Sequence, residues 1–196
     1  MNPKAFIFFG RSGCGKGTQA QLLLDYLKEK NPEADSLYIQ TGAEFRKFME
    51  QDNFTSKRVG EFLSTGKLLP EFLPIWMWTS IFIDKFTAKE NLVFDGISRR
   101  VEEAPVLDGA LDFYDIKDRY VVYINVSEGW ARERLLARGR SDDEKKEIDE
   151  RLAWFEKHVA PVVEIFRKNN KYNFLDINGE QTIEKVHQDI IDAIKG

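Results

Sequence analysis

The sequence predicts an α/β fold built on a five-stranded parallel sheet with helices on both faces. Two observations predict it. Short apolar runs alternate with helical periodicities along the chain, and the helical connections are long enough to return the chain to a parallel strand. The length of 196 residues suits one compact domain with a small insertion. Ligands of such sheets bind at the carboxyl ends of the strands.

The first expected strand, residues 4–9, is an apolar run that ends at a glycine-rich turn. The helix expected at residues 18–30 repeats apolar residues every three to four positions, which is typical of a helix packed on a sheet. The other expected strands are residues 36–40, 91–95, 119–126 and 172–177. Together these segments give the strand, loop and helix order of a parallel sheet.

Two stretches are helical for longer than this alternation requires. Residues 41–89 are helical almost throughout, with breaks expected near Asp52, at Gly66 and at Pro70, and we interpret them as the insertion. Residues 143–170 form one long helical pattern, which Pro161 is expected to kink because proline lacks the backbone N–H of a helix interior.

Composition excludes several classes of protein. One cysteine and two histidines cannot supply a disulfide scaffold or a structural zinc site, and a lone cysteine fits the reducing cytoplasm. The net charge of −4 argues against a nucleic-acid partner. The first apolar run is too short for a signal peptide or a membrane span. We therefore expect a cytoplasmic protein without a membrane or nucleic-acid partner and, by default, a monomer.

A glycine-rich loop, residues 10–18, lies between the first expected strand and the first expected helix. Glycines let successive backbone N–H groups converge on an anion, and the helix start and Lys16 add positive charge. The loop therefore predicts a cradle for nucleotide phosphates, although a tight turn without a ligand is the alternative. Gly17 occupies the usual place of the magnesium-binding hydroxyl, so whether Thr18 binds magnesium stays open.

Cys14 lies inside this loop. A thiol at a helix N-terminus is expected to ionise more easily than usual, and its alkylation is expected to block nucleotide binding. The alternative is that a small side chain simply fits there.

The loop residues Gly10, Gly13, Gly15, Lys16, Gly17, Thr18 and Gln19 resemble the nucleoside monophosphate kinases, adenylate kinases in particular. Further matches follow in the family's order and extend over essentially the whole chain. They are Thr41-Gly42 with Arg46; Gly66-Lys67-Leu68-Leu69-Pro70-Glu71; Asp95-Gly96 with Arg99; Arg134-Leu135-Leu136 with Arg138; Arg140, Asp142 and Asp143 with Arg151; and Asn178-Gly179.

The resemblance implies a P-loop NTPase fold of three layers, α/β/α, in a single domain over residues 1–196. Its core would be residues 1–40, 90–137 and 143–196, its monophosphate-binding insertion residues 41–89, and its minimal lid residues 138–142. The implied reaction is the reversible, magnesium-dependent transfer of the γ-phosphoryl group of ATP to AMP. A catalytically inactive nucleotide-binding regulator is the alternative from another class.

The resemblance also implies roles for individual residues. Lys16 and Arg138 would hold the donor's phosphates, Arg46 and Arg99 the acceptor's phosphate, and Arg140 and Arg151 the transferring group, while Arg134 would stack on the donor base. The catalytic residues would be Lys16, Arg99, Arg138, Arg140 and Arg151. The implied ATP site is Gly13, Cys14, Gly15, Lys16, Gly17, Thr18, Arg134, Arg138 and Gly179. The implied monophosphate site is Thr41, Gly42, Arg46, Leu69, Gly96, Arg99, Glu103, Arg140 and Arg151.

Asp95 and Thr41 each have a second interpretation. Asp95 ends an apolar strand, where an unpaired carboxylate is costly, so we expect it to bind magnesium through water. The alternative is a hydrogen bond to the glycine loop. Thr41-Gly-Ala-Glu44 also fits a capping box at a helix start.

Glu103 departs from the adenylate kinase pattern, which has glutamine at this place. An ionised carboxylate only accepts hydrogen bonds, which suits the N1–H and 2-amino groups of guanine, whereas adenine needs a donor as well. AMP is our first choice of acceptor because the other positions agree with it, and GMP or CMP is the alternative.

Overall fold

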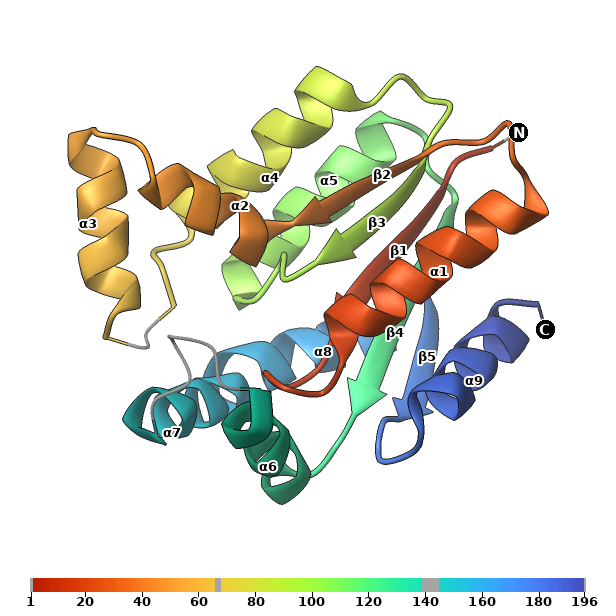
Figure 1. Cartoon of the computed structure of the whole chain (residues 1–196). Coiled ribbons are helices and arrows are strands. Elements are labelled where there is room, and N and C mark those ends of the chain that lie inside the picture. Colours follow the sequence, from red (N-terminus) through yellow and green to blue (C-terminus); the bar gives the residue numbers. More distant parts are fainter. Residues whose placement is uncertain (1, 66–67, 139–144, 196) are drawn as a thin grey trace.

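The computed structural model describes residues 2–65, 68–138 and 145–195 (Figure 1). A five-stranded sheet lies at its centre with all neighbouring strands parallel, as the sequence predicts. The strand order is β2-β3-β1-β4-β5. The strands are β1 (Lys4–Phe9), β2 (Ser36–Gln40), β3 (Asn91–Asp95), β4 (Asp118–Asn125) and β5 (Asn173–Asn178). β4 begins and ends one residue earlier than expected because its ladder with β1 starts at the pair Lys4 and Asp118. β5 lies one residue later than expected, in register with β4.

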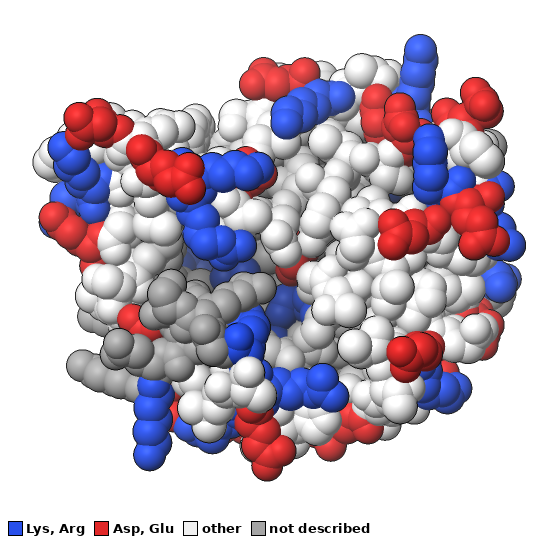
Figure 2. Space-filling model, in the orientation of Figure 1, with Lys and Arg blue, Asp and Glu red and all other residues white. Residues whose placement is uncertain are grey.

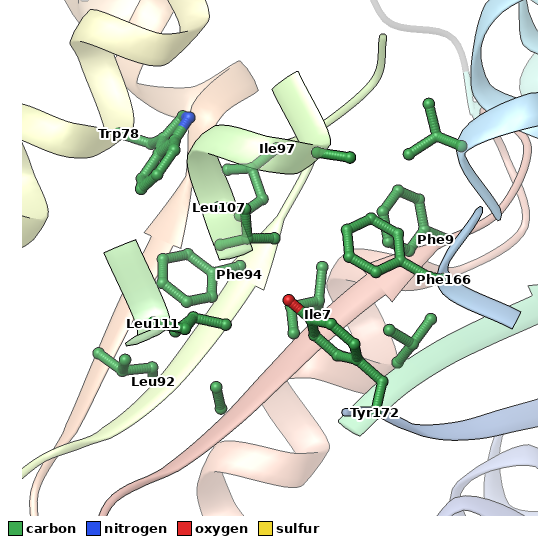
Figure 3. Close-up of a cluster of buried hydrophobic side chains, with 14 of the residues drawn as sticks. Ile7, Phe9, Trp78, Leu92, Phe94, Ile97, Leu107, Leu111, Phe166 and Tyr172 are labelled. Atoms are coloured by element: carbon green, nitrogen blue, oxygen red, sulfur yellow. The ribbon is translucent and has the colours of Figure 1, made fainter. Parts of the chain in front are cut away.

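One face of the sheet is covered by α4 (Phe72–Lys85), α5 (Ala104–Phe113) and α8 (Ala160–Lys168). β1 is central and alternates its side chains, so Ile7 and Phe9 point into this layer. They share a buried cluster with Trp78, Phe94 and Phe166 (Figure 3). The bulky residues of this cluster fix β1, and with it the start of the glycine loop.

The opposite face is covered by α1 (Lys16–Lys30), α6 (Glu128–Arg138), α7 (Lys145–Trp154) and α9 (Ile183–Lys195). Phe6 and Phe8 of β1 are buried in this second cluster. α1 begins two residues earlier than predicted, because Gly15 takes a left-handed backbone (φ 96°) and caps the helix directly before Lys16. The predicted arrangement of helices on both faces is confirmed.

The helical stretch after β2 consists of α2 (Thr41–Met49), α3 (Phe54–Leu63) and α4, and α2 and α3 lie beyond the carboxyl end of the sheet (Figure 1). The expected breaks at Asp52 and Pro70 fall between these helices, while Gly66 and Lys67 lie outside the described residues. A third cluster, Phe45, Val59, Leu69, Leu73 and Met77, packs the three helices together. This stretch therefore has a small core of its own.

The expected kink at Pro161 takes the form of a π-helical turn, η2 (Phe155–Val159), between α7 and α8. Pro161 donates no hydrogen bond, and its ring crowds the carbonyl four residues earlier, that of Lys157. The irregularity consequently lies in the turn before the proline rather than at the proline itself. A single 3₁₀ turn, η1 (Val101–Glu103), precedes α5.

None of the helices within the described ranges combines the length and the apolar character that a bilayer crossing needs.

Candidate active site

A cleft of about 1140 Å³ opens at the carboxyl ends of β1, β2 and β3, between the glycine loop, α2, α6 and α7. Phe9, Gln40 and Asp95, the last residues of those three strands, lie in its wall. Lys and Arg side chains gather around the hollow on this face of the molecule (Figure 2). The position agrees with the edge of a parallel sheet at which ligands bind.

Nearly all the candidate residues meet at this cleft. Those that line it are Gly13, Gly15, Lys16, Gly17, Thr18, Thr41, Gly42, Arg46, Leu69, Asp95, Gly96, Arg99, Glu103, Arg134, Arg138 and Arg151. Arg140 lies outside the described residues, as do Gly66, Lys67, Asp142, Asp143 and most of the expected lid. Cationic groups that are far apart in the sequence thus share one cavity.

Lys16 is folded across its own loop. Its Nζ donates hydrogen bonds to the carbonyl oxygens of Gly10 (2.8 Å) and Arg11 (3.0 Å). The backbone N–H of Cys14 donates to the same Arg11 carbonyl (3.2 Å). The loop is therefore closed by its own hydrogen bonds, and Lys16 lines the cleft.

Gly13 is required by its surroundings. Its φ is +87°, and a Cβ there would lie 2.8 Å from the Ala131 carbonyl oxygen and 2.9 Å from Leu135 Cγ, both on α6. We expect Gly13→Ala to lower the free energy of unfolding by roughly 1–3 kcal/mol, measured by urea denaturation, because of backbone strain and this overlap. Gly109→Ala is the control, since a Cβ in the exposed part of α5 meets nothing within 4 Å. If both variants are equally stable, the loop has another conformation.

Cys14 differs from its prediction. Its side chain is 3 % exposed and packs in the second core cluster rather than lining the cleft. Burial raises the pKa of the thiol above its usual 9.0, and the nearby Lys16 only partly opposes this effect. The expectation of an easily ionised thiol is wrong, because loss of solvent outweighs the helix N-terminus and the lysine.

Alkylation of Cys14 is consequently expected to be slow. Iodoacetamide at pH 8, followed by mass spectrometry, should modify the folded protein much more slowly than the urea-unfolded chain, because the thiol is buried and protonated. Equal rates in the two states would mean that the thiol is accessible.

Gly179 does not line the cleft. Its N–H donates to the Asn125 carbonyl (2.8 Å), and a Cβ would lie 2.6 Å from side-chain carbons of both Ile124 and Val126. This close approach to the end of β4 explains the glycine, and contact with a donor base stays a prediction.

Asp95, Gly96 and Arg99 form the wall of the cleft after β3. Gly96 has φ +81° and leaves room for the Arg99 guanidinium, whose central carbon would lie 3.2 Å from a Cβ at that position. The Arg99 central carbon also lies 5.8 Å from the centre of the Trp154 ring. Burial lowers the pKa of Arg99, and the carboxylates of Asp95 and Glu103 oppose this shift. An arginine stays charged even so, and this one lines the cleft, where an anion could bind.

The carboxylate of Asp95 is held by β2. Its Oδ2 accepts hydrogen bonds from Gln40 Nε2 (3.1 Å) and Tyr38 Oη (3.5 Å). These partners replace the hydrogen bond to the glycine loop that was the alternative prediction. A Cβ on Gly17 would lie 3.7 Å from the same Oδ2, so the carboxylate faces the loop. A single carboxylate beside a phosphate cradle is a donor set that suits Mg²⁺, which keeps several waters and binds substrate phosphates.

The capping box at Thr41 is not formed. Thr41 is already the first residue of α2, and its hydroxyl donates to the Asp95 carbonyl (3.2 Å), while Glu44 pairs with Lys47 (2.9 Å). The residue is 3 % exposed, so a bond across to β3 replaces a bond to its own helix. This bond fixes the start of α2 beside the end of β3.

Glu103 is 2 % exposed although it borders the cleft. Its Oε2 accepts a hydrogen bond from the Arg99 backbone N–H (3.2 Å). Burial raises the pKa of the carboxyl above its usual value, and the backbone bond and the charges of Arg99 and Arg100 oppose the rise. A buried acid of this kind favours its protonated form more than a surface glutamate does.

Three side chains at the site are missing from the sequence prediction. Trp130 lies under the Arg134 guanidinium, 4.0 Å from ring centre to central carbon, Trp154 lies under Arg99, and Gln40 holds Asp95. The only available signal was spacing, since Trp130 lies four residues before Arg134 on one helix and Gln40 directly precedes Thr41. Within the described chain, no three His, Cys, Asp or Glu side chains form a group that could hold a metal ion.

Comparison with known proteins agrees with this arrangement. The adenylate kinase family model matches residues 8–171. The chain is similar to adenylate kinases of Azobacteroides pseudotrichonymphae (32 % identity, covering 95 % of this chain and 94 % of the relative) and Corynebacterium urealyticum (31 %, 96 % and 97 %). The adenylate kinase of Campylobacter hominis is 34 % identical over 94 % of this chain and 92 % of the relative. Since both the family match and these similarities span nearly the whole fold, the chain belongs to the adenylate kinase family.

Proposed function

We propose that the protein transfers the γ-phosphoryl group of ATP reversibly to AMP and so forms two molecules of ADP. One observation carries the proposal: Lys16, Arg46, Arg99, Arg134, Arg138 and Arg151, which come from distant parts of the sequence, line one cleft. Its volume of about 1140 Å³ exceeds what a single small ligand needs and suits two nucleotides. Membership of the adenylate kinase family supports the same reaction.

The chemistry needs little more than charge and alignment. The acceptor is a phosphate oxygen that is already anionic, so no side chain has to remove a proton. The protein must instead bring two polyanions together and stabilise the negative charge on the transferring group. A planar guanidinium suits this task, because it binds two phosphate oxygens at once.

On the donor side, the glycine loop (Gly13, Gly15, Gly17 and Thr18) would hold the phosphates of ATP with its backbone N–H groups. Lys16 would leave the carbonyls of Gly10 and Arg11 to bind the same phosphates together with Arg138. Arg134 is already stacked on Trp130 and lines the cleft, and the opposite face of its guanidinium would stack on the donor base. Contacts of Cys14 and Gly179 with ATP would come from their backbone.

On the acceptor side, the helical stretch of residues 41–89 would form the monophosphate-binding insertion. Arg46 and Arg99 would hold the phosphate, and Thr41, Gly42, Leu69, Gly96 and Glu103 would enclose the nucleoside. Arg151, with Arg140 of the expected lid at residues 138–142, would bridge to the transferring group. Closure of that lid would exclude water, which otherwise competes with AMP for the phosphoryl group.

Magnesium would enter with ATP. Asp95 would hold it through a bound water, and the hydroxyl of Thr18 is a second candidate at the cleft. The ion would neutralise part of the phosphate charge. The contribution of this chain is to orient the carboxylate, which Gln40 and Tyr38 do from β2.

GMP is the second candidate acceptor because of the Glu103 carboxyl. A coupled assay for ADP formation from ATP with AMP, GMP or CMP tests the proposal, and AMP is expected to give the highest kcat/KM. If only GMP is phosphorylated, GMP rather than AMP is the acceptor. Tight nucleotide binding without turnover of any monophosphate would favour a regulator and refute the enzyme.

We place the enzyme in the cytoplasm as a monomer, with the two nucleotides as its partners. The single cysteine supports a reducing compartment. Size-exclusion chromatography with light scattering should give the mass of one chain, 22.8 kDa.

A further inference from the structure

Arg11 lies in the glycine loop but does not line the cleft. Its side chain, 15 % exposed, turns away from the phosphate cradle and into the protein. The Nη1 group donates a hydrogen bond to the carbonyl of Val126, the residue after β4 (2.8 Å). In the described part of the chain its Nε is buried without a partner from the protein, an arrangement that calls for an explanation.

The rest of the guanidinium contacts the π-helical turn η2. Nη2 forms an ion pair with Glu156, and the central carbon lies 4.7 Å from the centre of the Phe155 ring. Phe155 is 1 % exposed and belongs to the first core cluster, so this contact joins the loop to a rigid part of the protein. π-helical turns inside helices are frequent at functional sites.

The two ends of this link carry the groups proposed to act on phosphate. On the loop side, the Arg11 carbonyl accepts hydrogen bonds from Lys16 Nζ and from the Cys14 N–H. On the helix side, η2 continues directly from α7, which bears Arg151 and the Trp154 ring beneath Arg99. Arg11 therefore connects the loop that carries Lys16 to the turn that follows α7.

We propose that Arg11 is a positioning residue for phosphoryl transfer, which sets Lys16 and the glycine loop in register with Arg151 through Glu156 and Phe155. The inference rests on the proposed function, because the register matters only if donor phosphates and Arg151 act on the same group. A displacement of about 1 Å can cost up to 100-fold in rate when reacting groups must be aligned. Arg11 would thus affect turnover more than the binding of either nucleotide.

The test compares Arg11→Met with a matched control, Arg167→Met. Arg167 also combines ion pairs, to Glu164 (3.0 Å) and Asp176 (2.8 Å), with an aromatic contact, 4.2 Å from the Phe174 ring centre, but it does not line the cleft. We expect kcat of Arg11→Met to fall roughly tenfold or more with a change in KM for AMP of less than about threefold. Arg167→Met should keep the wild-type kcat even if its melting temperature falls as far as that of Arg11→Met.

Two more conservative variants still test the proposal if Arg11→Met does not fold. Arg11→Lys retains the charge in a single ammonium group without the planar fork and should recover part of kcat. Glu156→Gln, at a side chain that is 54 % exposed, should lower kcat less than Arg11→Met, and the double variant should be no worse than Arg11→Met alone. Wild-type kcat in both Arg11→Lys and Glu156→Gln would overturn the proposal, as would equal losses in Arg11→Met and Arg167→Met. Turnover by the wild type, measured first, tests the proposed function separately.

Discussion

Replacement of Arg151 by methionine is expected to lower kcat on the order of a thousandfold while the protein stays folded. Arg151 lies on α7 and lines the cleft with Lys16 and Arg99. A cation that bridges donor and acceptor stabilises the charge of the transition state, so its loss should reduce kcat far more than it weakens the binding of ATP or AMP. Steady-state kinetics at saturating nucleotide, with circular dichroism as a check on folding, measure the effect.

Arg151→Lys and Arg132→Met complete the experiment. Lysine keeps the charge without the planar fork, so an intermediate rate is expected. Arg132, on α6, pairs with Asp149 of α7 and with Glu128 (2.8 Å) but does not line the cleft, so its removal should leave kcat within about twofold of wild type, as is usual for a partly exposed ion pair. If Arg151→Met keeps more than a tenth of the wild-type kcat, the transferring group is stabilised elsewhere.

The strands and the cleft were predictable because they depend on short sequence patterns and on the order of these patterns along the chain. Buried strands such as Lys4–Phe9 are continuous apolar runs, and a glycine loop that follows such a strand predicts where phosphates would bind. The spacing of the arginines was also informative, since every candidate arginine within the described residues lines the cleft. A parallel sheet brings the carboxyl ends of its strands to one edge, so motifs that follow different strands in the sequence lie close together in the fold.

The errors have a different origin, because they concern partners that are distant in sequence. The hydroxyl of Thr41 bonds across to β3 instead of forming a capping box, and Cys14 packs in the second core cluster. The carboxylate of Asp95 bonds across to β2, where the alternative interpretation expected the glycine loop. Local rules favour a capping box or an ionised thiol at those positions, but burial against a neighbouring element decides the outcome. Arg11 shows the same limit, since nothing near it in the sequence indicates Val126 or Glu156.

Glu103 has a measurable effect on stability because of its burial. Its pKa in the folded protein is raised above the usual 4.5, so between the two values the folded state binds a proton that the unfolded chain has lost. The contribution of Glu103 to the free energy of unfolding is then fully present below about pH 4.5 and is lost as the pH rises through the folded pKa. The difference in free energy of unfolding between the wild type and Glu103→Gln should therefore shift against the wild type from pH 5 to pH 8, which urea denaturation of both proteins at the two pH values would measure.

The same protonation should select the purine base. A protonated Glu103 can donate to N1 of adenine and accept from its 6-amino group, whereas the carboxylate can only accept, from N1–H and the 2-amino group of guanine. Arg99 and Arg100 are the charged groups that act on this carboxyl, and both favour its ionised form. The ratio of kcat/KM for AMP to that for GMP should therefore fall as pH rises, because ionised Glu103 loses the donor that adenine requires.

Glu103→Gln should remove this pH dependence and raise the ratio of AMP to GMP efficiency at pH 8 by up to about 100-fold, since an unsatisfied buried polar group costs about 1–3 kcal/mol. The titration of the monophosphate itself cancels in the ratio because both substrates carry the same phosphate. Glu102→Gln, at the exposed neighbour in η1, is the matched control and should leave the ratio unchanged. A ratio that is flat with pH and unaltered in Glu103→Gln would show that another group recognises the base, and Glu103 would then act only through its bond to the Arg99 backbone.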